Sequence, residues 1–230
     1  MKALADPVRA VRTRGYFKAG PAGNVEGDVF LGVTTPQLRG VLRAHPDLTL
    51  EECIELLDSE WHEVRLLAVL GMARLAKKAT PDERLRIRRA YLAHTDRINN
   101  WDLVDSSAGE AVGLSVLERD ELDVLEKLAQ SESLWERRIA IVATFAHLRA
   151  GAVEPTLRIA QLLLGDRHDL IHKATGWLLR EVGKRDEAAL ERFLDRHAAT
   201  MPRTALRYAI EKMPPDVRRA WLNRKARPRT

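Results

Sequence analysis

Residues 59–75 read SEWHEVRLLAVLGMARL, and their apolar side chains recur every three or four positions, as in an amphipathic helix. Four later segments align with this one: 97–112 (RINNWDLVDSSAGEAV), 133–148 (SLWERRIAIVATFAHL), 169–184 (DLIHKATGWLLREVGK) and 202–213 (PRTALRYAIEKM). The alignment puts Arg65, Asp102, Arg138, Lys173 and Arg207 in register, at spacings of 37, 36, 35 and 34 residues. Such a period fits two antiparallel helices with their turns. We therefore predict an all-α fold, a HEAT-like α-solenoid of antiparallel helix pairs.

Helix start signals agree with this prediction. Thr35-Pro36, Thr80-Pro81 and Glu154-Pro155 each place a proline where the first turn of a helix tolerates it. The one short strand candidate, 28–33 (DVFLGV), lies in the glycine-rich stretch 19–36, which we interpret as a long loop between helices. A phosphate-cradling loop is the weaker alternative for this stretch, because it has no GxGxxG or Walker pattern.

Length and composition restrict the class of protein. The chain has 230 residues, of which 45% are hydrophobic, so we expect a single HEAT-like repeat domain over 1–230 with a basic tail at 218–230. No apolar run approaches the ~18 residues of a membrane span, and the N-terminus has no apolar signal segment. Cys53 is the single cysteine, which excludes an intramolecular disulfide and a cysteine-rich zinc site. We expect a cytoplasmic monomer.

Charge is unevenly distributed along the chain. The residues after Asp216 carry six cations and no acid, which leaves a net charge of −1 on the other 216 residues, since the whole chain carries +5. A polyanion would therefore bind the body of the protein through a local arrangement of charge. The aligned row of four cations and one acid would provide such a positively charged surface on the concave face, suited to a DNA backbone. The alternative, strongest for Arg65 and Arg207, is a structural ion pair with a neighbouring acid.

The segment 101–105 (WDLVD) is the strongest local anomaly. Trp101 and Asp105 are four residues apart and share a helix face. In the alignment, the position of Asp105 is otherwise occupied by small or apolar residues: Ala68, Ile141, Gly176 and Ile210. A carboxylate in a core-like position lowers the stability of the fold by several kcal/mol unless a hydrogen bond or an opposite charge compensates it. Such a residue is therefore a candidate for binding or catalysis. The alternative is a structural acid bonded to Arg138. We interpret Asp102 as a first-turn acid favoured by the helix dipole.

A second tryptophan, Trp177, lies near the start of its own predicted inner helix. Gly176 precedes it and removes a side chain, which we expect to leave room for a group to approach the indole. Two indoles beside an acid would suit a cationic ligand through cation–π attraction. We assign Trp61 and Trp135 to packing and Trp221 to a C-terminal helix.

Several motifs together resemble the AlkD-like family of DNA alkylation-repair glycosylases. They occur in the family's order over residues 16–213: YFKAG, EGDVFLGV, WDLVD, LWERRIAIV, HKATGWLLREVGK and RTALRYAIEKM. The resemblance implies a curved solenoid that holds duplex DNA in its concavity. It also implies hydrolysis of the N-glycosidic bond of cationic N3- or N7-alkylated purines, as in base excision repair, without a metal or other cofactor. A protein of this kind would associate with the nucleoid.

The resemblance also implies roles for individual residues. Asp105 resembles the family's catalytic acid, and Trp101 and Trp177 resemble the aromatic pair at the damaged nucleotide. Arg138 resembles the DNA-contacting arginine of the site, although Arg137 stays open as the alternative. The aligned Lys173, Arg207 and Arg65 complete the predicted DNA-binding row.

Two other classes of protein compete with the glycosylase. The first is a non-catalytic HEAT-repeat scaffold that binds nucleic acid or protein, which would leave Asp105 and its two tryptophans without a role. The second is a metal-dependent hydrolase, but the histidines show no HExxH or HxH spacing. We therefore expect no metal site, no membrane association, and duplex DNA with alkylated purines as the partner.

Overall fold

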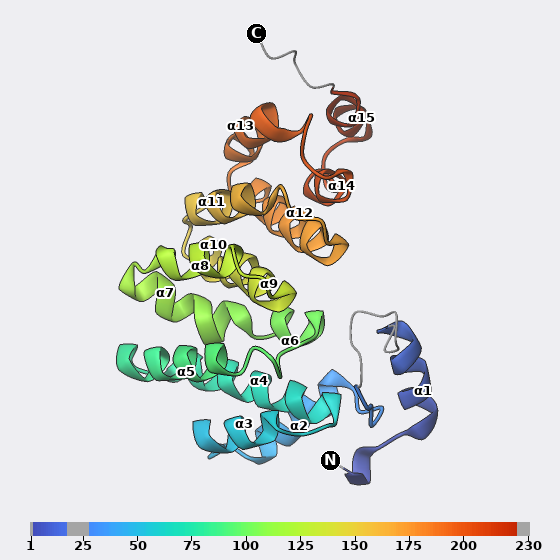
Figure 1. The fold of residues 1–230 in the computed structure, drawn as a ribbon, viewed down its shortest axis with the longest axis vertical. Helices are drawn as coiled ribbons and strands as arrows, with labels where there is room; N and C mark the ends of the chain where they lie inside the picture. Colours follow the sequence, from blue (N-terminus) through green and yellow to red (C-terminus); the bar gives the residue numbers. More distant parts are fainter. Residues whose placement is uncertain (1, 18–27, 225–230) are drawn as a thin grey trace. The chain divides into compact units, whose positions relative to one another are not determined.

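The computed structural model describes residues 2–17 and 28–224. Within these residues the regular elements are helices (Figure 1), and the only β-type pairing is an isolated bridge between Val29 and Trp61. The all-α prediction is therefore confirmed. The chain divides into two compact units, 1–115 and 116–230, each described here by itself. The prediction of one repeat domain over the whole chain stays a prediction.

The first unit contains helices α1 to α6, a short 3-10 helix and a π-helix. Their bounds are η1 (Lys2–Leu4), α1 (Pro7–Tyr16), α2 (Thr35–Ala44), α3 (Leu50–Leu57), α4 (His62–Lys78), α5 (Pro81–Ala93), α6 (Trp101–Asp105) and the π-helix η2 (Gly109–Gly113). Helix α4 is central, because it packs against α2, α3, α5, α6 and η2. Helix α7 (Leu114–Arg119) continues directly from η2 across the boundary between the units.

The second unit repeats one packing unit, a pair of helices. Its helices are α8 (Leu122–Ala129), α9 (Leu134–Ala143), α10 (Phe145–Arg149), α11 (Glu154–Leu163), α12 (Asp169–Gly183), α13 (Glu187–His197), α14 (Arg203–Ala209) and α15 (Pro215–Asn223). Helices α8 and α9 pack together, as do α11 and α12. In addition α8 contacts α11 and α9 contacts α12, so one pair stacks on the next.

The predicted helix starts are confirmed. Proline occupies the first or second position of α2, α5 and α11, where a missing backbone N–H costs nothing. Thr80 also forms a capping box: its hydroxyl accepts from the Glu83 amide, and the Glu83 carboxylate accepts from the Thr80 amide.

The strand candidate 28–33 is an extended connection rather than a strand. The Glu63 carboxylate, from the first turn of α4, accepts hydrogen bonds from the backbone amides of Leu31 (2.8 Å), Gly32 (2.7 Å) and Val33 (3.3 Å). One buried carboxylate thus satisfies three amides that a second strand would otherwise pair. Residues 18–27, on which the phosphate-loop alternative depends, lie outside the described residues.

The first residues of the predicted basic tail, 218–230, lie in a helix. Residues 215–223 form α15, the C-terminal helix predicted for Trp221, and Trp221 is buried in it. The Arg224 guanidinium lies 4.1 Å from the centroid of the Trp221 ring and forms an ion pair with Asp195. Arg218, Arg219 and Arg224 therefore belong to ordered structure, and 225–230 lie outside the described residues.

Candidate active site

Helix α6 is a short helix that is anchored by its apolar residues. Asn100 caps its N-terminus, with Oδ1 accepting from the Trp101 amide at 2.8 Å. Leu103 and Val104 are fully buried, and they leave Trp101 and Asp105 half-buried on the same face. The π-helix η2 follows and packs on α4 and α5. The site acid thus lies at the end of one fixed turn, with part of its surface exposed.

The structure corrects the alignment at Asp105. The residues aligned with it (Ala68, Ile141, Gly176 and Ile210) are all buried, whereas Asp105 is half-buried. Counted from the first helical residue, Asp105 is fifth in α6, just as Arg138, Lys173 and Arg207 are fifth in α9, α12 and α14. Asp105 therefore does not replace a core residue. It takes the helix position that carries cations in the second unit.

Aromatic side chains surround Trp101. Its ring centroid lies 5.3 Å from that of Phe17 and 6.0 Å from that of Tyr16, the latter in an edge-to-face arrangement. Phe17 in turn stacks on Phe30 at 5.5 Å, with the two planes 8° apart. Tyr16 and Phe17 belong to the YFKAG motif, whose role in the site was not deduced from the residues. The Trp101 indole therefore contacts two rings at the C-terminal end of α1, one of which stacks on Phe30 of the 28–33 connection.

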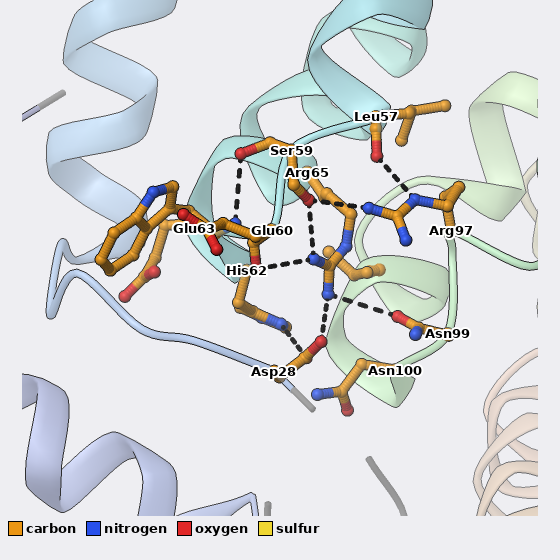
Figure 2. Close-up of polar contacts among 12 residues, drawn as sticks. Asp28, Leu57, Ser59, Glu60, His62, Glu63, Arg65, Arg97, Asn99 and Asn100 are labelled. Atoms are coloured by element: carbon orange, nitrogen blue, oxygen red, sulfur yellow. Dashed lines mark hydrogen bonds and ion pairs between the residues drawn. The ribbon is translucent and has the colours of Figure 1, made fainter. Parts of the chain in front are cut away.

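A chain of charged groups holds α6 to α4, and Figure 2 shows its part around His62, Asp28 and Arg65. The ring of His62, 1% exposed, bonds Asp28 through Nδ1 (2.9 Å) and Asp102 through Nε2 (2.8 Å). Burial opposes the charged ring, but the hydrogen bonds and charges of Asp102 and Asp28 outweigh it and raise the pKa of His62 to about 9. Asp102 is thus a bridging acid, beyond the dipole role predicted for it.

Arg65 belongs to the same buried chain of groups. It is 2% exposed, its Nη2 donates to Asp28 Oδ1, and its Nη1 donates to the carbonyls of Ser59 (3.0 Å) and Glu60 (3.1 Å). Burial works against ionisation of Asp28, but the His62 hydrogen bond and the Arg65 charge hold the pKa of Asp28 below its usual range. The structural alternative for Arg65 therefore fits its surroundings, and the predicted phosphate contact does not.

In the second unit, Trp177 is half-buried and contacts Phe145, with ring centroids 5.9 Å apart. The expected open space at Gly176 is wrong. A Cβ there would lie 2.4 Å from the Ala205 carbonyl oxygen and 2.5 Å from the Tyr208 Cβ. Glycine therefore permits the close approach of α12 to α14 rather than access to the indole.

The cations of the second unit differ in availability. Arg138 is 4% exposed, and its Nη1 donates to the Leu170 carbonyl. Lys173 forms an ion pair with Asp169 at 2.7 Å, and this hydrogen bond raises the pKa of the lysine. Arg207 is exposed. Arg137 bonds Asp166 at 2.6 Å and its side chain is 20% exposed, so the choice between Arg137 and Arg138 stays a prediction.

Residues 2–17 and 28–224 contain neither a cluster of metal ligands nor a membrane-spanning helix. No three histidine, cysteine, aspartate or glutamate side chains there are grouped as metal ligands. In the same residues no helix is both long and apolar enough to cross a membrane.

The chain is similar to a known protein family and to a solved structure. A family model described as DNA alkylation repair enzyme matches residues 1–213. No curated protein matches the chain. A solved structure, described as a predicted DNA alkylation repair enzyme from Enterococcus faecalis, is similar with a TM-score of 0.71. The match covers 92% of this chain and 97% of that one at 17% identity, so it shows a shared fold.

Proposed function

Because the chain belongs to the DNA alkylation repair enzyme family, we propose that it is a DNA glycosylase acting on cationic N3- or N7-alkylated purines in duplex DNA. The observation that carries the proposal is the half-buried Asp105 at the end of an anchored helix, on the same face as Trp101. A carboxylate in this setting is partly desolvated and still exposed to a ligand. Those are the properties required of a group that stabilises a developing cation.

The proposed reaction breaks the bond between C1′ of the deoxyribose and the purine nitrogen. The bonding electron pair moves to the purine and neutralises its positive charge, so the base leaves without being protonated. Positive charge then develops on the sugar as an oxocarbenium ion, which the Asp105 carboxylate stabilises. A water oxygen bonds to C1′, and Asp105 accepts the proton that this water loses. No step needs a metal.

Trp101 and Trp177 are the proposed aromatic groups at the damaged nucleotide. An indole face stabilises a cation electrostatically and displaces water from it. The contacts of Trp101 with Phe17 and Tyr16 support this role, because a fixed ring loses little entropy when the ligand arrives.

DNA binding is assigned to Lys173 and Arg207, which have exposed surface, and to Arg138. Cations of this kind supply sequence-independent affinity by neutralising phosphates. Arg65 is left out of the proposal because its donors serve Asp28 and two backbone carbonyls. The HEAT-like solenoid with a concave DNA-binding face is retained as part of the proposal, and it rests on the 34–37-residue period of the sequence.

One assay tests the proposed function. Wild-type protein is incubated with methylated duplex DNA in the presence of a chelator, and released N3-methyladenine and N7-methylguanine are measured. We expect release by the wild type and by an Asp96→Asn control, which changes an exposed acid of the same unit. We expect almost none from Asp105→Asn. DNA binding without release by the wild type would favour the non-catalytic scaffold.

A further inference from the structure

His62 joins its own helix, α4, to two segments of the first unit that are distant from it in sequence. Its ring, on α4, bonds Asp28 of the 28–33 connection and Asp102 of α6. We propose that His62, as an imidazolium bonded to both carboxylates, is the positioning residue that fixes α6 and thereby the direction of Asp105. This inference rests on the proposed function for its catalytic meaning, but the positioning itself can be measured without DNA.

The geometry requires a charged ring. Asp28 and Asp102 each present an oxygen to one nitrogen of the ring, at 2.9 and 2.8 Å. Ionised carboxylates only accept hydrogen bonds, and a neutral imidazole has a single N–H to donate. The Arg65 guanidinium on the other oxygen of Asp28 favours the ionised form of that acid. Only the imidazolium therefore satisfies both carboxylates, and in a buried site an unsatisfied contact would be costly.

The same ring contacts the aromatic groups behind the proposed site. The centroid of His62 lies 5.1 Å from that of Phe17 and 4.9 Å from that of Phe30. Phe17 contacts Trp101 at 5.3 Å. A cation beside two rings gains attraction from their faces. The imidazolium therefore acts on α6 by two routes, through Asp102 and through the ring that contacts Trp101.

The charged groups around His62 define how the contact responds to pH. They are Asp28 from the connection, Asp102 from α6 and Arg65 from α4, while the Glu63 carboxylate is directed to the amides of 31–33. The His62 hydrogen bond and the Arg65 charge outweigh burial and hold the pKa of Asp28 below its usual range, whereas the pKa of His62 is raised to about 9. Loss of the contact on raising the pH is therefore assigned to deprotonation of His62 itself.

The first experiment labels the protein with 5-fluorotryptophan and follows the fluorine resonance of Trp101, assigned with Trp101→Phe, as the pH is raised. We expect this resonance in the wild type to shift with a midpoint near pH 9. In His62→Arg the shift should vanish, because arginine keeps a planar cation with donors for both acids at every pH used. A resonance that does not titrate in the wild type would overturn the proposal.

The second experiment compares amide hydrogen exchange of Leu103 and Val104 in the free protein at neutral pH. His62→Gln should increase exchange by roughly tenfold or more, the scale of one lost charged hydrogen bond, and His62→Arg should restore most of the protection. The control is His147→Gln, which also removes a buried histidine but in the second unit, with no carboxylate bonded to the ring. It should leave α6 unchanged. Equal exchange in His62→Gln and the wild type would contradict the proposal.

The last comparison separates this inference from the proposed function. Single-turnover base release by His62→Gln should fall about tenfold while the Kd for DNA changes less than about twofold, with recovery in His62→Arg. If wild-type protein releases no base but the fluorine and exchange results hold, the glycosylase proposal fails and the positioning role stands. If His62→Gln does not fold, Asp102→Asn replaces it, because the Asp102 side chain is less buried than the His62 ring. This variant should lower the pKa of His62, and an unchanged His62 titration would overturn the inference.

Discussion

Arg65 and Arg137 make the same backbone contacts in their two helices: each Nη1 donates to the carbonyls six and five residues earlier in the chain. Each is also the fourth residue of its helix and bonds an aspartate, Asp28 or Asp166. The structural counterpart of Arg65 is therefore Arg137, one residue before the position given by the sequence alignment.

This pairing predicts the consequence of removing Arg137. Arg137→Gln leaves the buried Asp166 carboxylate and two carbonyls short of donors, so we expect a loss of roughly 2–4 kcal/mol in the free energy of unfolding. Urea denaturation measures it, and the Kd of the folded variant for DNA should stay within about twofold of the wild type. A stable Arg137→Gln with weakened DNA binding would show that Arg137 is the site arginine.

Asp105→Asn separates a catalytic acid from a structural one. We expect base release to fall by ~10²–10³-fold, the scale for losing one preorganised stabilising group. The melting temperature should change little, because Asp105 is half-buried and does not occupy a core position. Single-turnover release and thermal denaturation are measured on one preparation. Normal release with a clearly lowered melting temperature would identify a structural acid.

Salt dependence tests the DNA-binding cations. Binding should weaken with salt with a log–log slope of several units, and Lys173→Ala should reduce this slope by about one. Lys127→Ala is a matched control, because Lys127 forms an (i,i+4) ion pair with Asp123 that resembles that of Lys173 with Asp169. The control should keep the wild-type slope. Equal slopes for all three proteins would remove Lys173 from the interface.

The charged state of His62 predicts how stability depends on pH. Its folded pKa of about 9 lies above the ordinary value of 6.5, so the stabilisation is complete below pH 6.5 and is lost as the pH rises through 9. The wild type should lose on the order of 3 kcal/mol of unfolding free energy through this group between those limits. Urea denaturation at pH 6 and pH 9.5 measures the loss, with His62→Gln as reference. A parallel loss in both proteins would assign the effect to other groups.

The sequence predicts the helices well, because their apolar period and their threonine–proline starts are local properties of the chain. It predicts contacts across the chain poorly. His62 meets Asp28 and Asp102 at separations of 34 and 40 residues, and no local period encodes such a contact. The alignment places Asp105 in the core because it is anchored on Asp102, whereas α6 begins at Trp101 after its Asn100 cap. The cap, a visible N-terminal signal, would have given the register found in the structure.

The π-helix at Gly109–Gly113 has a consequence for comparing relatives. A π-turn holds one residue more than the α-turn that would follow the same path. The chain therefore carries one surplus residue shortly after Asp105, in a segment enclosed by α4 and α5. Homologues that lack this surplus should align across 109–113 with a single-residue gap. The offset in residue number between this chain and such a homologue would then change by one across 109–113, although the side chains on both sides of the gap correspond.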